Sequence, residues 1–160
     1  MSDPALAEML HNSLYYLYLV LNENDRYVFA RYGLTIPRFY ALQHLNNEPG
    51  MSFARLSDLM LTDRANVTRI VRSMELDGLI ERRLNEEDRR SFQLQLTEKG
   101  AALYAQATAA HQSDIRARFK GSHDLVDEAF VTRLRALQRE LDEHLKILKQ
   151  STSSPAQERW

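Results

Sequence analysis

The sequence predicts a mostly α-helical (α+β) fold in which long terminal helices flank a smaller helical segment and a two-stranded β-hairpin. Two observations carry this prediction. Over most of the chain apolar residues recur at spacings of three and four, which places them on one face of a helix. After Gly78 the spacing changes to two, as in strands whose side chains alternate between core and solvent. The 160 residues, 44% of them hydrophobic, suit one domain with a helical extension.

The first predicted element is a long amphipathic helix from Ala5 to Arg31. Its apolar residues fall three or four positions apart: Leu6, Met9, Leu10, Leu14, Leu17 and Leu21. Polar residues 22–26 end the apolar run far short of the roughly 20 residues that a membrane span needs. No charged and apolar leader is seen, so a cytoplasmic protein without a membrane partner is expected.

Two shorter helices are predicted next, from Ser52 to Met60 and from Arg64 to Asp77, with the turn 61–63 between them. The second helix buries Val67, Ile70, Val71 and Met74. Thr62 or Asp63 can cap its first turn, and Gly78 stands where a helix end favours a left-handed residue. Two helices joined by so short a turn predict a helix-turn-helix.

The exposed face of the second helix is expected to carry polar and basic groups. These are Arg64, Asn66, Thr68, Arg69 and Arg72. Guanidinium, hydroxyl and amide groups contact phosphates and base edges, so this helix is the candidate for the major groove of DNA. An arginine-rich helix face is also typical of a plain solvated surface, and the order of the surrounding elements favours DNA.

Two strands, Ile80 to Leu84 and Phe92 to Leu96, are predicted from alternating apolar and polar residues. The connection 85–91 is too polar for a core and is expected to project as a loop. Its Arg89 and Arg90 suit a minor groove, whose negative potential attracts guanidinium groups, and Asp88 can pair with Arg90 and fix its direction. Two further arginines, Arg82 and Arg83, stay ambiguous because they can simply pair with neighbouring acids.

The C-terminal part is predicted to be helical from Ala101 to Lys120 and again after the break at Gly121-Ser122, where Ser122 or Asp124 can cap the next helix. That helix carries an apolar stripe close to a heptad seam: Phe130, Leu134, Leu137, Leu141, Leu145 and Leu148. Residues 151–160 lack periodicity and contain a proline, so they are predicted to form a disordered tail.

The predicted organisation is a winged helix-turn-helix domain at 33–100 and a helical dimerisation region formed by 1–32 and 101–150. The apolar stripes of the terminal helices can pack within one chain or against a second copy. The second copy is favoured, because a palindromic DNA site needs a two-fold protein whose recognition helices lie about 34–36 Å apart.

Composition narrows the possible functions. The net charge of −1, from 21 basic and 22 acidic residues, argues against a generally sticky nucleic-acid binder, so positive charge must be placed locally. The chain has no cysteine, which excludes disulfides, thiolate metal sites and peroxide sensing by cysteine oxidation. No Gly-rich phosphate loop, G-x-S-x-G turn or cysteine nucleophile is present, so no enzyme is predicted.

Four motifs resemble the multiple-antibiotic-resistance regulator (MarR) family, in the order that the family has them. They are Thr68-Arg69, Asp77-Gly78-Leu79-Ile80-Glu81-Arg82, Asp88-Arg89-Arg90-Ser91 and Leu96-Thr97-Glu98-Lys99-Gly100. Weaker similarity includes residues 34–42. The resemblance implies a transcriptional regulator, usually a repressor, that binds an inverted-repeat operator as a homodimer. It also implies that the helix from Arg64 enters the major groove, that Arg90 enters the adjacent minor groove, and that Asp88 orients Arg90.

The resemblance further implies release of DNA when a small molecule, often aromatic and acidic, enters a cleft between the dimerisation helices and the winged domain. The candidate ligand-binding residues are His11, Tyr15, Tyr18 and His44, with Tyr16, Phe39 and Tyr40 as aromatic neighbours. The competing interpretation is that the tyrosines fill a core and hydrogen-bond at their tips.

Five histidines raise the question of a zinc site. They are His11, His44, His111, His123 and His144. No two stand four positions apart and cysteine is absent, so ordinary surface or capping histidines are expected, with no metal and no cofactor. Two alternative functions stay open: a winged-helix protein-interaction module, and a transcriptional activator without a small-molecule ligand.

Overall fold

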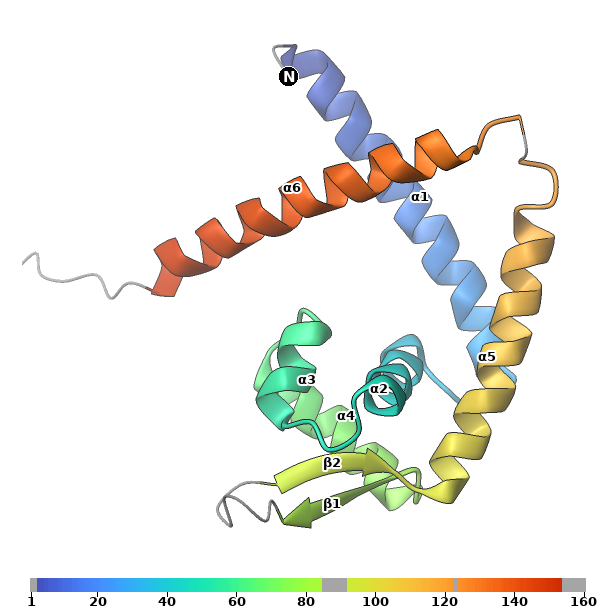
Figure 1. Ribbon diagram of the computed structural model, residues 1–160, viewed down its shortest axis with the longest axis vertical. Helices are drawn as coiled ribbons and strands as arrows, with labels where there is room; N and C mark the ends of the chain where they lie inside the picture. The colour runs from blue at the N-terminus through green and yellow to red at the C-terminus, as the bar shows by residue number, and fades with distance from the viewer. Residues whose placement is uncertain (1–2, 85–91, 123, 154–160) are drawn as a thin grey trace, which may run out of the picture. The chain divides into compact units, whose positions relative to one another are not determined.

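The protein was analysed as a computed structural model, which describes residues 3–84, 92–122 and 124–153 (Figure 1). In this part of the chain the elements are α1 (Pro4–Ala30), α2 (Ile36–Asn47), α3 (Phe53–Leu59), α4 (Arg64–Leu76), β1 (Ile80–Leu84), β2 (Phe92–Leu96), α5 (Glu98–Arg118) and α6 (Glu128–Ser153). The predicted mostly α-helical fold with a two-stranded sheet is confirmed. The chain divides into two compact units, Met1–Ile115 and Arg116–Trp160.

Helix α1 begins where the Asp3 side chain accepts a hydrogen bond from the Ala5 backbone N–H at 3.0 Å, with Pro4 in the first turn. Only its C-terminal end enters the core of the first unit, through Val28 and Phe29. Apolar residues earlier in the helix are exposed in the single chain: Leu6, Met9, Tyr15, Tyr16, Leu17, Tyr18, Leu19 and Val20. The tyrosines therefore do not fill a core of this chain.

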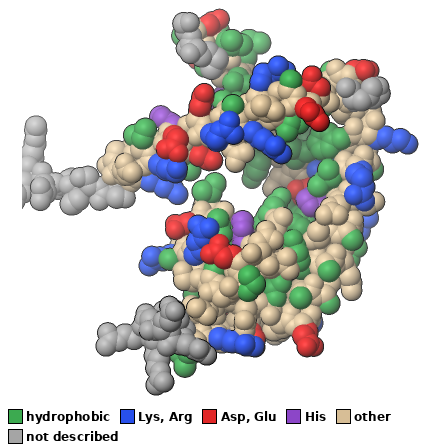
Figure 2. Space-filling model, viewed as in Figure 1, with side chains coloured by type: hydrophobic (Ala, Val, Ile, Leu, Met, Phe, Trp, Pro, Cys, Tyr) green, Lys and Arg blue, Asp and Glu red, His purple; other side chains and the backbone are tan. Residues whose placement is uncertain are grey.

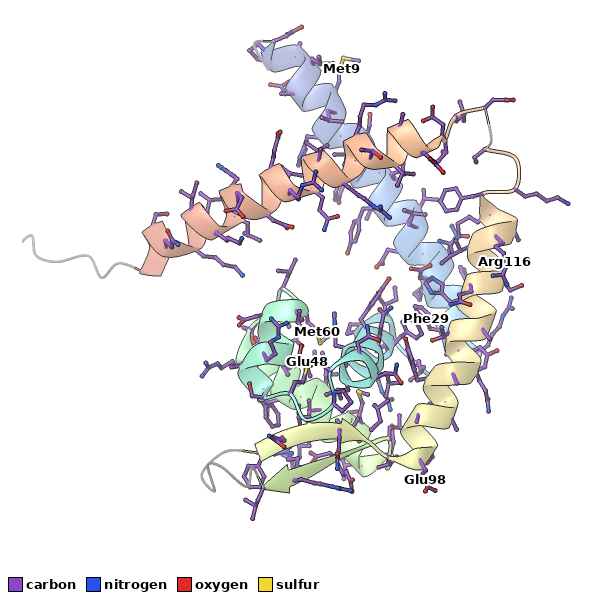
Figure 3. The ribbon with its side chains drawn as sticks, in the orientation of Figure 1. Met9, Phe29, Glu48, Met60, Glu98 and Arg116 are labelled. Atoms are coloured by element: carbon purple, nitrogen blue, oxygen red, sulfur yellow. The ribbon has the colours of Figure 1, made fainter. Side chains whose placement is uncertain are left out.

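The core of the first unit lies between α1, α2, α5 and the helix-turn-helix. Phe29 and Phe39 stack at its centre, with ring centroids 3.9 Å apart and planes 16° from parallel. Figure 3 labels Phe29 at the end of α1, near α5. Phe39, predicted as a neighbour of a ligand, is only 1% exposed and belongs to this core.

Asp25 of α1 and His111 of α5 meet beside that aromatic pair. Their side chains are only 12% and 14% exposed, and His111 Nε2 lies 3.1 Å from Asp25 Oδ1. The imidazole also packs edge-on against Phe29 at 4.8 Å between centroids. The expectation of ordinary surface or capping histidines is thus wrong for His111. A local sequence pattern could not predict this pair, because its two residues are 86 positions apart.

The helix-turn-helix has the predicted buried face. Val67, Val71 and Met74 are fully buried and Ile70 is 7% exposed. Of the two predicted caps, Asp63 is the one used, since its carboxylate accepts from the Asn66 N–H at 2.7 Å. Gly78 follows α4 with a φ of +69°, as predicted. The turn between α3 and α4 contains Leu61 at φ +49°, a conformation that costs a non-glycine residue roughly 1–2 kcal/mol.

Strands β1 and β2 pair antiparallel, with Ile80 opposite Leu96 and Leu84 opposite Phe92. Only the half of the hairpin nearest the helices is buried, through Ile80 and Leu94. Leu84 and Phe92 are 57% and 46% exposed, so the predicted alternation between core and solvent does not reach the outer end of the hairpin. The sequence also did not indicate the bridge between Met51 and Leu94, which ties the chain before α3 to β2.

The second unit contains the end of α5, a turn and α6. Asp127 caps α6 by accepting from the Phe130 N–H at 2.6 Å, so the predicted caps Ser122 and Asp124 are wrong. Ser122 instead accepts turn hydrogen bonds through its carbonyl. Helix α6 extends to Ser153, three residues into the predicted tail. Among the described helices, none is both long enough and apolar enough to span a bilayer.

The apolar stripe of α6 is uncovered in the single chain. Phe130, Leu134, Leu141 and Leu148 are 37–54% exposed, and Leu137 and Leu145 are half-buried. The predicted domain boundaries stay a prediction, since neither the helical dimerisation region nor its separation from 33–100 is tested by one chain.

Candidate nucleic-acid interface

The outer face of α4 presents the predicted basic and polar groups to solvent. Arg64, Thr68, Arg69 and Arg72 are exposed and Asn66 is half-buried, while the opposite face is locked in the core. Because both ends of α4 are fixed by Asp63 and Gly78, the helix is held as a rigid support for these side chains. On the face drawn in Figure 2, basic and acidic side chains are interspersed.

Two of the arginines are available for a partner. Within the described part of the chain, Arg64 and Arg72 have no hydrogen-bond or ion-pair partner. Thr68, in contrast, donates its hydroxyl to the Arg64 carbonyl at 2.7 Å and keeps only acceptor capacity. Two free guanidinium groups two turns apart can each meet a phosphate.

Asn66 and Arg69 are already bound to each other. Arg69 Nη2 donates to Asn66 Oδ1 at 2.7 Å, and Asn66 Nδ2 donates to Thr62 Oγ1 at 2.9 Å. The amide retains one N–H and one oxygen lone pair, so Asn66 can still contact a base. The guanidinium of Arg69 is held in one direction before any DNA arrives, which lowers the entropy lost on binding.

The sequence left Arg82 and Arg83 open, and the structure pairs both with acids. Arg83 Nη2 lies 2.7 Å from Glu81 Oε1, and Arg82 pairs with Glu75 at the end of α4. The Arg82 guanidinium also lies over the Phe53 ring, 4.9 Å from its centroid. Arg82 therefore joins β1 to α3 and α4.

The predicted wing residues Asp88, Arg89 and Arg90 lie outside the described residues. Their assignment to the minor groove stays a prediction.

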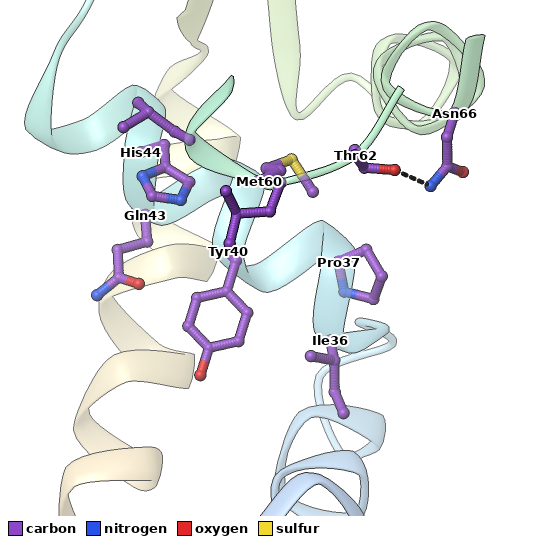
Figure 4. A pocket seen from close by; sticks show the side chains of 10 residues that line it. Ile36, Pro37, Tyr40, Gln43, His44, Met60, Thr62 and Asn66 are labelled. Atoms are coloured by element: carbon purple, nitrogen blue, oxygen red, sulfur yellow. Dashed lines mark hydrogen bonds between the residues drawn. The ribbon is translucent and has the colours of Figure 1, made fainter. Parts of the chain in front are cut away.

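A cavity of about 580 Å³ lies between α2 and the α3–α4 turn, within the first unit (Figure 4). It is lined by Ile36, Pro37, Tyr40, Gln43, His44, Leu59, Met60, Leu61, Thr62 and Asn66. Burial lowers the pKa of His44, and the charge of Arg55 lowers it further while Glu48 opposes them, so the neutral form of the imidazole is favoured.

Only one of the four predicted ligand-binding residues lines this cavity. His44 lines it, whereas His11, Tyr15 and Tyr18 lie exposed on α1 and are not among its lining residues. Sequence reasoning missed Thr62 and Leu61, although their position in the turn before the recognition helix was a usable signal. In the described residues no group of three potential metal ligands comes together.

Comparison with known proteins identifies the family. A family model described as the MarR family matches residues 32–91. A Thauera aromatica protein named for regulation of the hcr operon is 32% identical over 125 residues, which cover 71% of this chain and 75% of that protein. The chain belongs to the MarR family.

Two further proteins are similar to this chain. The transcriptional regulator PetP of Rhodobacter capsulatus is 32% identical over 82 residues, 51% of this chain and about half (49%) of PetP. The repressor CouR, solved bound to a 23-mer DNA duplex, is 26% identical with a TM-score of 0.74, and the match covers 88% of this chain and 98% of CouR. The MarR-family chain is accordingly a transcriptional regulator of the winged-helix type and not an enzyme.

Proposed function

We propose that this MarR-family regulator is a repressor that binds an inverted-repeat operator as a homodimer and releases it when a small aromatic acid binds. The observation that carries the DNA-binding part is the outer face of α4, on a helix whose other face is core. There Arg64 and Arg72 have no partner among the described residues, and Arg69 is exposed and held by Asn66. The relative CouR, a repressor by name, was solved on a DNA duplex, which supports the same use here.

Selection of bound DNA from a random pool tests the operator. We expect an inverted repeat whose half-site centres are one helical turn apart, because two recognition helices related by a two-fold axis meet successive major grooves. Substituting Arg69 with alanine should relax the preference at one base pair in each half-site. A pool that yields no enriched sequence would favour the alternative of a protein-interaction module.

The wing prediction concerns Arg90. We expect Arg90→Ala to weaken operator binding and to reduce the slope of log affinity against log salt concentration by about 0.9, the equivalent of one phosphate contact. Fluorescence anisotropy between 50 and 200 mM salt, roughly the range in which the effect is large, measures it. Arg135→Ala, an exposed arginine of α6, is the control and should change neither quantity. An unchanged affinity for Arg90→Ala at every salt concentration would exclude the wing contact.

The homodimer is proposed from the uncovered stripe on α6 and the exposed apolar face of α1. An apolar stripe of this length is costly in water and is typical of a helix that packs against a partner. We expect Leu141→Asp to lower the association constant of the dimer by at least tenfold, since it buries a charge in the apolar stripe of α6. Sedimentation equilibrium measures this, with Thr132→Asp on the opposite face of α6 as control. Equal dimerisation of both variants would move the interface elsewhere.

The effector part rests on the cavity between α2 and the α3–α4 turn. Its apolar lining and its few polar groups, Tyr40, Gln43, His44 and Thr62, suit a small aromatic molecule with one hydrogen-bonding group. Thermal unfolding in the presence of a series of benzoic and phenolic acids tests this, because a ligand that binds only the folded state raises the melting temperature.

Expression of a reporter gene tests the sign of regulation. Reporter expression that falls when the regulator is deleted would indicate an activator and not a repressor.

A further inference from the structure

Two residues, Pro37 and Asn66, line both the cavity described above and a second cavity beside α4, and of the two only Asn66 has a side chain that forms hydrogen bonds. The second cavity, of about 400 Å³, is lined by Thr35, Pro37, Arg38, Asn66, Arg69, Ile70 and Ser73. Thr62 lines the first cavity and Arg69 lines the second. The two hydrogen bonds of Asn66 run from one to the other, through Thr62 Oγ1 at 2.9 Å and Arg69 Nη2 at 2.7 Å.

The amide of Asn66 can take only one orientation in this arrangement. A guanidinium group has donors only, so the amide oxygen must face Arg69. The amide nitrogen then faces Thr62, whose hydroxyl accepts its hydrogen bond, as Figure 4 shows. The direction of Arg69 is therefore tied to whether Thr62 offers a lone pair to Asn66.

Thr62 is itself held at its main chain. Its N–H donates to the Ser57 carbonyl at 3.2 Å, and its carbonyl accepts from the buried Ser57 hydroxyl. The preceding Leu61, which also lines the first cavity, is in the left-handed conformation. Since the main chain is fixed, rotation of the Thr62 side chain is the movement left to this residue, and its hydroxyl hydrogen is free to donate to an occupant of the cavity.

We infer that Thr62 and Asn66 form a relay through which an occupant of the first cavity redirects Arg69 and so changes operator recognition. Asn66 is a positioning residue in this scheme: it sets the direction of the Arg69 guanidinium. An occupant that takes a hydrogen bond from Thr62 rotates the whole side chain, so that Oγ1 moves away from Asn66 Nδ2. The amide of Asn66 can then turn, and it no longer holds the Arg69 guanidinium. The inference rests on the proposed function, because it assumes that Arg69 contacts DNA.

The absence of cysteine from the chain allows the cavity to be filled without knowing the natural ligand. Gln43 lines the cavity, so Gln43→Cys places the single thiol of the protein there, and N-phenylmaleimide fills the cavity with an aromatic group. Gln112→Cys, exposed on α5, carries the same label as control. Operator affinity is then measured for labelled and unlabelled protein, in the natural background and with Thr62→Val, which removes the relay hydroxyl at nearly constant volume.

We expect the label at Gln43→Cys to lower operator affinity about tenfold, mainly by loss of preference at the base pair read by Arg69, and the label at Gln112→Cys to have no effect. With Thr62→Val the label should have less than about a twofold effect, because the relay is already cut. If the label at Gln43→Cys lowers operator affinity equally with Thr62 and with Thr62→Val, or lowers it in neither protein, the relay is wrong.

A second measurement separates this result from failure of the proposed function. NMR relaxation of the Arg69 side-chain Nε–H in the free protein reports how firmly the guanidinium is held. Thr62→Val should make Arg69 as mobile as Arg72, whose guanidinium has no described partner. If Arg69 is mobile in the natural protein, the relay is wrong even where DNA binds. If Arg69 is rigid and Thr62→Val frees it, the hydrogen-bonded link from Thr62 to Arg69 holds even where no operator is found, and the failure is then that of the proposed function.

Discussion

Substitution of Gly100 with alanine is expected to destabilise the protein by about 3 kcal/mol or more, or to prevent folding. Gly100 lies in the first turn of α5, buried against the start of β1, and a Cβ atom there would meet the Leu79 carbonyl oxygen at 1.9 Å. That oxygen belongs to the backbone and accepts a hydrogen bond from the Thr97 N–H at 3.1 Å. It cannot move aside without breaking this hydrogen bond, which holds the segment between β2 and α5. Urea unfolding measured at one chain concentration gives the free energy.

The matched control for this experiment is Gly121→Ala. A Cβ at Gly121 meets no atom within 4 Å and the residue is exposed, so its free energy of unfolding should stay within about 0.5 kcal/mol of the natural protein. A Gly100→Ala protein as stable as the Gly121→Ala protein would show that α5 does not approach Leu79 so closely. The close approach also explains why a glycine ends the motif Leu96 to Gly100, since no side chain fits there.

Most helices and both strands of this fold were predictable because each depends on a local pattern, whereas no periodic pattern predicted α2. The period of α4 fixed its buried face, Gly78 marked its end, and the change of period after Gly78 marked the hairpin. Caps were less predictable. Asp63 was one of two candidates for α4, and the two candidates for α6, Ser122 and Asp124, stand five and three residues before the observed cap Asp127. Several polar residues in that turn can each cap a helix, and only tertiary position decides which one does.

The candidate site was predictable as a surface but not as a network. Periodicity placed Arg64, Arg69 and Arg72 on the outer face of α4, where the structure has them. It could not show that Arg82 would be held by Glu75 and Phe53, because those residues lie on other elements. The same limit hid the pair of Asp25 and His111, since two half-buried polar residues far apart in sequence leave no periodic signal.

The second large effect is expected from Phe29→Ala, which should lower the free energy of unfolding by about 3–5 kcal/mol. Phe29 has no exposed surface, stacks on Phe39 and packs against the His111 ring. With Val28 it brings the C-terminal end of α1 into the core, so truncation weakens the packing of α1 against the rest of the first unit. Because residues 4–30 are proposed to form part of the dimer interface, the dimerisation constant should fall together with stability.

Phe92→Ala is the control: it removes an aromatic ring that is not buried, and so shows how much of the effect of Phe29→Ala comes from burial. Phe92 is 46% exposed at the outer end of β2, so the same deletion should cost about 1 kcal/mol or less and leave dimerisation unchanged. Hydrogen exchange adds a local readout: amides at the C-terminal end of α1 should lose protection in Phe29→Ala before those of α4 do. Equal losses throughout would mean that α1 and the winged domain unfold as one cooperative unit, and that α1 cannot move independently when the regulator changes its affinity for DNA.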